Sequence, residues 1–382
     1  MGSSLRTIQV VNVRWFNATA WYGLKLSQLL NAAGHQTTVV ALKDTETFAK
    51  AESMGLHPLA LPLNAKNPLQ FAGLLRDMTR LVREVRPQVV NCHRGESFLF
   101  WGLLKMLCPA SNRFALIRTR GDQRLPKANL PNRLLHTRVA DAVISTNTVM
   151  TGYFANHLGV PAERLHTLFG GVDTTRFHFD AAGRNAVRAR YGYTEKDCVL
   201  GLLGRFDRVK GQQELIVAVA RLVREGLPIR LLLLGFSTAT SQEAVEGWIH
   251  EAGMERHVHI TGKVPDVTAC LSALDVGVVA SLWSETIARA ALEIMACGIP
   301  LVATPVGVMP DLLPATALTP AFTVADSPDP AVVDGLTVLL RRAVCDTAWR
   351  QELAHTCRTR ISTLRDEDFL AETLAVYTHA LQ

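Results

Sequence analysis

Residues 198–226 read CVLGLLGRFDRVKGQQELIVAVARLVREG, and this stretch decides the fold. A short, continuously apolar run at 198–203 leads through a loop into a segment that we expect to be a helix. The same alternation of apolar strand and helix recurs along most of the chain. Strands that are apolar throughout and alternate with helices predict parallel sheets covered by helices on both faces.

Length and a polar interruption indicate two domains. The chain has 382 residues, which is more than one hydrophobic core usually organises. The polar segment 179–197 interrupts the alternation, so we place the boundary at 178/179. The prediction is an α/β protein with two doubly wound domains, each expected to bind ligands at the carboxyl ends of its strands.

Composition and cysteine use are those of a soluble globular protein. Apolar residues make up 48% and charged residues 19% of the chain, and no apolar run approaches about 18 residues, the length that spans a bilayer. The first residues run directly into a strand without a secretory apolar region. The 7 cysteines are scattered and form no Cys-x-x-Cys pair. We therefore expect a cytoplasmic protein with neither disulfides nor a zinc site.

Charge divides the chain into a basic and an acidic half. Residues 1–178 carry 21 Lys and Arg against 10 Asp and Glu, whereas the remainder carries 19 against 24. The basic half is expected to face something anionic, such as a membrane surface, a phosphorylated acceptor or a nucleic acid. Aromatic residues are sparse among its basic clusters, which argues against nucleic acid.

Two acids bracket the expected start of a helix in residues 284–293, SETIARAALE. Glu285 precedes a turn of small residues, and free amides at a helix start can bind phosphate. Glu293 lies eight residues further on, and a carboxylate can accept hydrogen bonds from both hydroxyls of a ribose. The alternative is that Glu285 only complements the helix dipole and Glu293 is solvated. On the first interpretation the phosphate-binding turn is formed by Thr286, Ile287 and Ala288.

Two cations lie in the expected strand-to-helix loop of residues 203–211. Arg205 and Lys210 are five residues apart, and glycines stand at 204 and 211. Side chains of this kind can hold a diphosphate and neutralise a departing nucleotide. They could also be ordinary surface residues, but cations at a helix amino terminus oppose its dipole, which favours a bound anion.

Taken together, GRFDRVKG, SLWSETIARAALEIMACGIPLVAT and GGVDTTRF resemble the retaining nucleotide-sugar glycosyltransferases of family 4. That family has the GT-B architecture, in which two Rossmann-like domains face each other across a cleft. The resemblance covers most of residues 179–363 and, more loosely, residues 1–178. It also implies that residues 364–382 cross back onto the first domain, and that donor and acceptor meet in the cleft.

The resemblance assigns roles to residues of the second half. It implies that Glu285 contacts the transferred sugar, that Glu293 contacts the ribose, and that Arg205 and Lys210 bind the phosphates. Residues 170–173, GGVD, match the family's Asn-Gly-Val-Asp with Gly170 in place of Asn, which keeps the turn but loses a side-chain contact. The implied contacts to the base and to the remaining donor atoms are Gly171, Gly235, Phe236, Lys263 and Val264.

The first half departs further from the family. Many relatives have a Gly-Gly pair after the first strand, whereas this chain has the small residues Asn17, Ala18 and Thr19. Relatives often carry a histidine after the fifth strand, where this chain has Arg120. His93, at the end of the preceding strand, is our candidate to replace it, although a hydrogen-bonded structural histidine is the alternative. The neighbouring basic residues, which could also be solvated surface, are Arg118, Arg124 and Lys127.

Two segments of the basic half bear on membrane contact. Residues 69–86 place Arg76, Arg80, Arg83 and Arg86 at helical spacing on an amphipathic helix. Residues 98–108 are apolar nearly all round, which fits a buried core helix better than a membrane contact. Peripheral attachment to an anionic membrane is therefore one expectation.

The sequence thus predicts a retaining glycosyltransferase that needs neither metal nor cofactor. Its donor is a nucleoside-diphosphate sugar, and its acceptor is a glycan or lipid-linked molecule, as in cell-envelope or lipopolysaccharide synthesis. Arg205 and Lys210 would stabilise the charge that develops on the diphosphate. The alternatives are a non-catalytic sugar-nucleotide-binding protein and a related two-Rossmann epimerase. A dinucleotide dehydrogenase is disfavoured, because no Gly-x-Gly-x-x-Gly follows the first strand.

Overall fold

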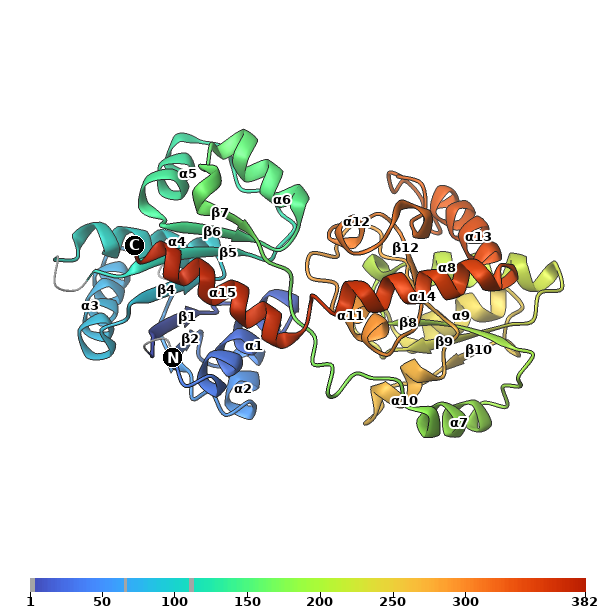
Figure 1. Cartoon of the computed structure of the whole chain (residues 1–382). Helices are drawn as coiled ribbons and strands as arrows, with labels where there is room; N and C mark the ends of the chain where they lie inside the picture. Colours follow the sequence, from blue (N-terminus) through green and yellow to red (C-terminus); the bar gives the residue numbers. More distant parts are fainter. Residues whose placement is uncertain (1–3, 65–66, 110–112) are drawn as a thin grey trace. The chain divides into compact units, whose positions relative to one another are not determined.

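The chain folds into two compact α/β units (Figure 1). The structure is a computed structural model that describes residues 4–64, 67–109 and 113–382. The first unit comprises Met1–Gly170 and Asp366–Gln382, and the second comprises Gly171–Arg365. Residues 171–178, which we placed in the first domain, therefore pack in the second unit, where the amide of Val172 donates to the carbonyl of Leu364 at 3.0 Å.

A seven-stranded parallel sheet forms the centre of the first unit, in the order β3-β2-β1-β4-β5-β6-β7. Its central strands are buried because their side chains are covered on both faces. The strands are β1 Arg6–Val10, β2 Gln36–Ala41, β3 Leu59–Ala60, β4 Val89–Cys92, β5 Ala115–Arg120, β6 Ala142–Ser145 and β7 Leu165–Thr167.

Helices of the first unit cover this sheet by burying apolar faces. The amphipathic face expected for α3 is confirmed, since Leu74, Met78, Leu81 and Val82 all lie in the core. Side chains that accept hydrogen bonds from the first turn mark several helix starts, as Asn17 does for α1. The helices are α1 Ala18–Ala32, α2 Glu46–Ser53, α3 Pro68–Val85, α4 Gly95–Leu107, α5 Leu130–Leu134 with η2 Leu135–Val139, α6 Thr148–Tyr153 with η3 Phe154–Leu158, η4 Ala162–Arg164, and α15 Asp366–Ala380.

The second unit contains a five-stranded parallel sheet in the order β10-β9-β8-β11-β12. Its strands are β8 Cys198–Leu203, β9 Ile229–Leu234, β10 Val258–Ile260, β11 Val276–Val279 and β12 Leu301–Ala303. Its helices are α7 Ala181–Arg190, η5 Arg208–Lys210, α8 Gln212–Arg224, α9 Gln242–Glu251, α10 Val267–Ser272, α11 Arg289–Ala296, α12 Met309–Leu312, η6 Ala315–Ala317, α13 Pro330–Cys345 and α14 Thr347–Ile361.

The polar segment that separates the two strand–helix series is itself folded. Asp180 caps α7, and two arginines of that helix, Arg184 and Arg188, pair with Asp275 at 2.7 and 3.1 Å. Arg188 is 6% exposed, so these ion pairs hold α7 against the segment before β11, within the second unit. The segment is polar because its arginines make ion pairs, and not because it is an unstructured linker.

The expected fold class of two parallel α/β units is confirmed. Because every strand pairing in each sheet is parallel, the carboxyl ends of the strands meet at one edge of that sheet. Loops from this edge carry most of the residues that the sequence singled out. Among the described residues, no helix is both long enough and apolar enough to span a bilayer.

Candidate functional site

The loop between β8 and α8 places both predicted cations at the carboxyl edge of the second sheet. Lys210 ends the short helix η5, and its aliphatic stem lies 3.6 Å from the position a side chain at Gly204 would take. Arg205 is 48% exposed and pairs with Asp207 at 2.9 Å. Gly211 has φ +67, and a Cβ there would lie 2.0 Å from the carbonyl oxygen of Ala280, so only glycine fits.

Glu285 lies in the loop that follows β11, and its side chain forms an ion pair with Lys210. Glu285 as a whole is 7% exposed, and its carboxylate also accepts a hydrogen bond from the hydroxyl of Ser281 at 2.6 Å. Its backbone is fixed as well, because the amide of Val308 donates to the Glu285 carbonyl at 2.7 Å. The structure therefore brings Lys210 and Glu285 together although they are far apart in sequence.

The prediction that residues 286–288 form the first turn of a helix is wrong. Helix α11 begins only at Arg289, and Ala288 before it adopts the left-handed conformation with φ +50. Small residues alone gave no signal of this conformation, which costs a non-glycine residue about 1–2 kcal/mol. Ile287 is 2% exposed, so its side chain belongs to the core and only its backbone could meet a ligand.

Glu293 projects from α11 and pairs with Arg289 on the preceding turn at 3.0 Å. Burial raises the pKa of Glu293, and the positive charge of Arg289 opposes that shift. The alternative of a solvated face is therefore wrong, since the Glu293 side chain is only 12% exposed. A buried carboxylate with one cationic partner can still accept hydrogen bonds from a polyol.

The predicted base-binding residues lie in two neighbouring loops of the same edge. Phe236 follows β9 and is 38% exposed, and the ammonium group of Lys263 lies 4.6 Å from the centre of its ring. Gly235 lets this loop pass close to the loop after β8, because a Cβ there would lie 2.2 Å from the carbonyl oxygen of Gly204. Val264 follows Lys263 and is half-buried. Gly171 is buried beside Val172 in the segment that joins the second unit.

In the first unit, the residues after β1 form the amino end of α1. The side chain of Asn17 accepts a hydrogen bond from the amide of Ala20 at 3.1 Å, and so caps the helix. The hydroxyl of Thr19 donates to the carbonyl of Gly121 at 2.9 Å, which ties α1 to the loop after β5. Ala18 begins the helix, so this segment offers a small-residue helix start in place of a glycine pair.

His93 and the arginines of β5 are buried at the carboxyl edge of the first sheet. His93 is 0% exposed, and burial with the nearby Arg118 charge lowers its pKa to about 3, so the ring is neutral. Arg120 is 8% exposed and pairs with Asp122 at 2.8 Å. Arg118, which we expected to be a cleft or surface residue, is 0% exposed, and burial lowers its pKa to about 9.

Several polar residues around these positions were missed. Ser281 holds Glu285, and Arg289 holds Glu293. In the first unit, Gln9 and Asn91 hydrogen-bond to the hydroxyl of Tyr377 inside the protein. A polar residue within each apolar strand run, IQVVNV and VVNC, was the available signal for Gln9 and Asn91.

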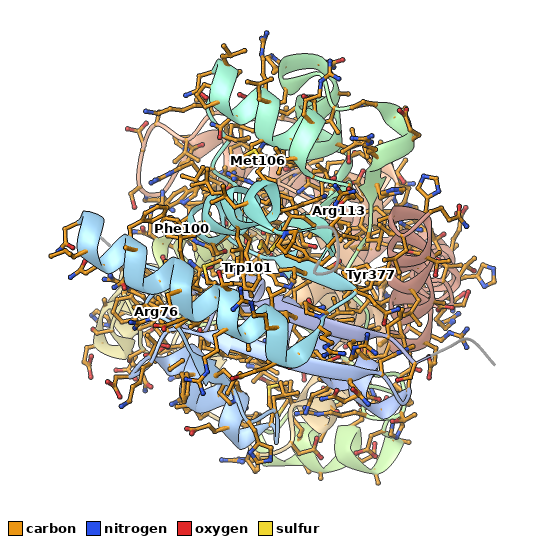
Figure 2. The ribbon with its side chains drawn as sticks, turned by 90° about the vertical axis from the view of Figure 1, so that its left-hand side faces the viewer. Arg76, Phe100, Trp101, Met106, Arg113 and Tyr377 are labelled. Atoms are coloured by element: carbon orange, nitrogen blue, oxygen red, sulfur yellow. The ribbon has the colours of Figure 1, made fainter. Side chains whose placement is uncertain are left out.

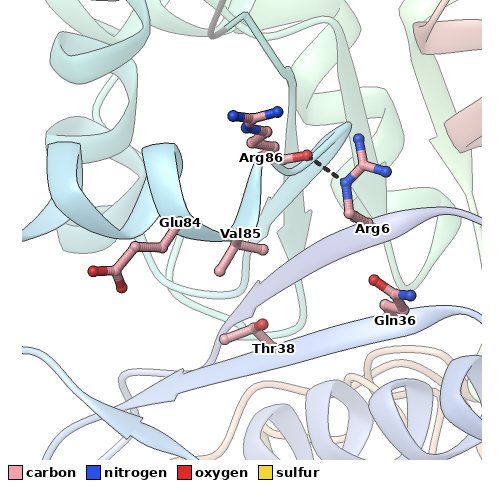
Figure 3. Close-up of a pocket in the computed structure, with 6 residues that line it drawn as sticks. All are labelled: Arg6, Gln36, Thr38, Glu84, Val85 and Arg86. Atoms are coloured by element: carbon pink, nitrogen blue, oxygen red, sulfur yellow. Dashed lines mark hydrogen bonds between the residues drawn. The ribbon is translucent and has the colours of Figure 1, made fainter.

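A separate pocket of about 560 Å³ lies at the opposite edge of the first sheet (Figure 3). Arg6 and Gln36, which begin β1 and β2, line it together with the end of α3. The guanidinium of Arg6 donates to the carbonyl of Arg86 at 2.8 Å across it. None of the predicted site residues lines this pocket, so it is unrelated to the candidate site.

Known proteins resemble the chain in both sequence and fold. The curated D-inositol 3-phosphate glycosyltransferase of Pseudarthrobacter chlorophenolicus is 27% identical over 258 residues, which are 62% of this chain and 61% of that protein. The GDP-mannose-dependent alpha-(1-6)-phosphatidylinositol monomannoside mannosyltransferase of Mycolicibacterium smegmatis is 31% identical over 207 residues, which are 52% of this chain and 50% of that protein. The match thus spans only about half to three-fifths of these two relatives.

Two solved structures show the same fold along the chain. A glycosyltransferase from Rickettsia africae ESF-5 superposes with a TM-score of 0.83 at 13% identity, covering 100% of both chains. Anabaena Alr3699/HepE in complex with UDP superposes with a TM-score of 0.78 at 17% identity, covering 97% of this chain and 100% of that one. These likenesses support the two-unit GT-B fold.

Family models match both units. The model described as Glycosyltransferase Family 4 matches residues 20–176, which include His93 and Arg120. The model described as Glycosyl transferases group 1 matches residues 197–341, which include both cations and both acids of the second unit. The chain therefore belongs to the group 1 glycosyltransferases of family 4.

Proposed function

We propose that this protein is a retaining, metal-independent glycosyltransferase that uses a nucleoside-diphosphate sugar as donor. The observation that carries the proposal is the pairing of Lys210 with Glu285 at the carboxyl edge of the second sheet, where Arg205 lies in the same loop as Lys210. Parallel sheets bind their ligands at this edge. The family assignment and the GDP-mannose dependence of one relative support the same donor class.

In the proposed mechanism, Arg205 and Lys210 bind the diphosphate and stabilise the negative charge that develops as the glycosidic bond breaks. These two cations supply the charge that a divalent metal supplies in other transferases. When the donor binds, Lys210 exchanges part of its contact with Glu285 for phosphate oxygens, and the Glu285 carboxylate accepts hydrogen bonds from the transferred sugar. The acceptor hydroxyl attacks the sugar from the face that the diphosphate leaves, and an oxygen of the departing diphosphate takes the proton of that hydroxyl. The anomeric configuration of the sugar is therefore retained.

The remaining residues of the second unit select the nucleotide. Glu293 accepts hydrogen bonds from the ribose hydroxyls, and the positive charge of Arg289 favours the ionised form of its carboxylate against the effect of burial. Phe236 and Lys263 contact the base, with the ring of Phe236 available for stacking once Lys263 moves from its face. In this proposal the transfer reaction requires no cofactor besides the donor.

We further propose that the acceptor is a glycan or a lipid-linked molecule of the cell envelope, such as a lipopolysaccharide core, and that the first unit contacts an anionic membrane from the cytoplasmic side. Figure 2 shows α3 with Arg76 pointing outward and Met106 of α4 above it. The side chains of Arg76 and Arg80 are 82% and 79% exposed, and Leu107 of α4 is 71% exposed. Basic and apolar side chains in this combination bind lipid headgroups.

The donor test measures binding and turnover separately. Thermal shift with UDP, GDP and ADP identifies the nucleotide, and turnover of the corresponding sugar donors with glycan acceptors measures transfer. K210A should lower turnover about 100- to 1,000-fold, whereas K196A, an exposed lysine of the same unit, should not. Added EDTA should leave turnover unchanged, and NMR should show a product anomer that matches the donor.

Other outcomes separate the alternatives. Nucleotide binding without any turnover would indicate a non-catalytic sugar-nucleotide-binding protein, and isomerisation of the donor sugar would indicate an epimerase. Membrane contact is tested by sedimentation with phosphatidylglycerol and phosphatidylcholine vesicles. The variant R76E/R80E should lose binding to the anionic vesicles, whereas R221E, at an exposed ion pair of the second unit, should keep it.

A further inference from the structure

A buried chain of hydrogen bonds joins the last helix of the first unit to His93. Tyr377 lies on α15 and is 0% exposed, and Figure 2 labels it. Its hydroxyl accepts a hydrogen bond from the amide nitrogen of Gln9 at 3.0 Å and another from that of Asn91 at 2.9 Å. The side-chain oxygen of Gln9 then lies 3.1 Å from Nε2 of His93.

The neighbouring groups set the direction of these bonds. The hydroxyl of Thr119 donates to the side-chain oxygen of Asn91 at 2.9 Å, so the nitrogen of Asn91 faces Tyr377. With the nitrogen of Gln9 also bound to Tyr377, the Gln9 oxygen faces His93. An amide oxygen can only accept, so Nε2 of His93 carries the proton in this arrangement.

Packing places the other ring nitrogen on the opposite side. A Cβ at Gly23 would lie 3.1 Å from Cδ2 and 3.2 Å from Nε2 of His93, so this edge of the ring packs against α1. Nδ1 therefore lies on the other edge, where it is buried without a hydrogen-bond partner among the described residues. A buried, unpaired acceptor costs roughly 1–3 kcal/mol, which favours a ligand that supplies a donor.

We propose that Gln9 and Tyr377 are positioning residues that hold His93 in the neutral Nε2–H form, so that Nδ1 can accept a hydrogen bond from a sugar hydroxyl. The proposal rests on the proposed glycosyltransferase function for the identity of that hydroxyl. It gives α15 a role in the site of the first unit, since Tyr377 orients Gln9 and Gln9 orients the ring. His93 then binds a hydroxyl but cannot act as a general acid.

Nitrogen-15 NMR of histidine-labelled protein tests the tautomer without any substrate. The signals of His93 are assigned by their loss in H93Q. Between pH 5 and 8, roughly, the wild type should show only the neutral Nε2–H form, because the ring's pKa lies well below this range. An Nδ1–H form, which a reversed Gln9 amide would favour, or a ring that protonates near pH 6, overturns the proposal.

Two tyrosine variants make the test specific. Y377F removes the group that orients Gln9, so His93 should populate both tautomers, and the turnover number should fall about tenfold with little change in donor KM. Y22F is the matched control, because Tyr22 is also buried near His93 but its hydroxyl donates to the carbonyl of Leu168 at 3.3 Å. A Y377F protein with a single Nε2–H tautomer and unchanged turnover would overturn the positioning role.

The source of the hydroxyl is resolved by titrating the labelled protein. UDP-glucose and GDP-mannose probe a donor sugar, and methyl α-D-mannopyranoside and D-inositol 3-phosphate probe an acceptor. A shift of the His93 Nδ1 signal with either set, lost in Y377F but kept in Y22F, supports the proposal, and no shift with any probe overturns it. Absence of sugar transfer by the wild type would instead contradict the proposed function, because the tautomer assignment needs no turnover.

Discussion

The two units differ in how the polar groups at their carboxyl edges are paired, although the first edge also contains an ion pair, Arg120–Asp122. In the second unit, charged side chains stand on loops and pair with one another, as Lys210 does with Glu285 and Arg289 does with Glu293. In the first unit, His93 and Arg118 are fully buried, and each has side-chain nitrogen atoms without a partner among the described residues. The carboxylates of Glu285 and Glu293 thus have a charged partner before a ligand arrives, whereas these nitrogen atoms of the first edge have no hydrogen-bond partner among the described residues.

This difference teaches how each edge can respond to substrate. A paired edge must break ion pairs to bind a charged diphosphate, so its groups exchange one charged partner for another at small net cost. A buried and partly unpaired edge gains hydrogen bonds when a hydroxyl arrives and loses none. The first arrangement suits a dianionic donor, and the second suits a neutral polyol.

The largest expected effect comes from breaking the paired edge. K210M leaves the Glu285 carboxylate buried beside Ser281 without a cation, and should lower the free energy of unfolding of the second unit by about 2–4 kcal/mol. The double variant K210M/E285Q should recover most of this loss. Hydrogen exchange at β8 and β11 measures both.

The exposed pair Arg221–Asp334 provides the control for that prediction. R221M should cost less than about 1 kcal/mol, because both partners of this pair are exposed. Equal losses in K210M and R221M would show that burial adds nothing to the Lys210–Glu285 pair, and the contrast between the two edges would fail.

Acid should weaken the buried edge next. The pKa of His93 is lowered to about 3, against an ordinary value near 6.5, so the unfolded chain binds a proton that the folded chain does not. Stability is therefore lost as pH falls from about 6.5, at about 1.4 kcal/mol per pH unit, or roughly 2 kcal/mol at pH 5. Between pH 7 and pH 5, the free energy of unfolding measured in urea should therefore fall by roughly 2 kcal/mol less in H93Q than in the wild type.

His136 provides an internal comparison for the acid test. Burial lowers the pKa of His136 to about 4, and it titrates in both proteins, so the variant should keep part of the acid sensitivity. Identical pH dependence in H93Q and wild type would mean that His93 protonates normally in the folded chain.

Glu293 should respond to pH in the opposite sense and by less. Its folded pKa is raised by burial, so the stability tied to its protonated form is present at low pH and is lost as pH rises through the raised value. At pH 7 the free energy of unfolding of E293Q should therefore exceed that of the wild type by up to about 1 kcal/mol.

The same variant should bind the donor nucleotide about tenfold more weakly than the wild type, because an amide accepts fewer hydrogen bonds than a carboxylate. Isothermal titration and urea unfolding at pH 5 and 7 check both parts, and E246Q, an exposed acid of the same unit, serves as control.

The sequence reveals the second edge better than the first for a physical reason. Arg205 and Lys210 lie within one loop and Glu285 and Glu293 within one short segment, so local spacing alone marks them. The first edge is assembled from residues 9, 91, 93, 119 and 377, which only strand pairing and the return of α15 bring together. The apolar strands that alternate with helices along the chain predicted both sheets, because a strand that is buried on both faces is apolar along its whole length.

The misplaced helix start at residues 286–288 has a different cause. Apolar periodicity locates a helix but does not report the backbone angle of the residue before it, and alanine rarely adopts positive φ. In the structure Ala288 has φ +50 and lies between the Glu285 carbonyl, which accepts a hydrogen bond from the amide of Val308, and the start of α11 at Arg289.

Ala288 therefore gives the smallest test of the paired edge. A288G removes the left-handed penalty but adds freedom to the unfolded chain, so the free energy of unfolding should rise by no more than about 1 kcal/mol. A288V, whose branched side chain tolerates positive φ poorly, should instead destabilise the protein by more than A288G stabilises it. Thermal unfolding ranks the three proteins. If A288V is as stable as the wild type, Ala288 is not held in this conformation, and the amides before α11 are free to form the helical turn that the sequence alone predicts.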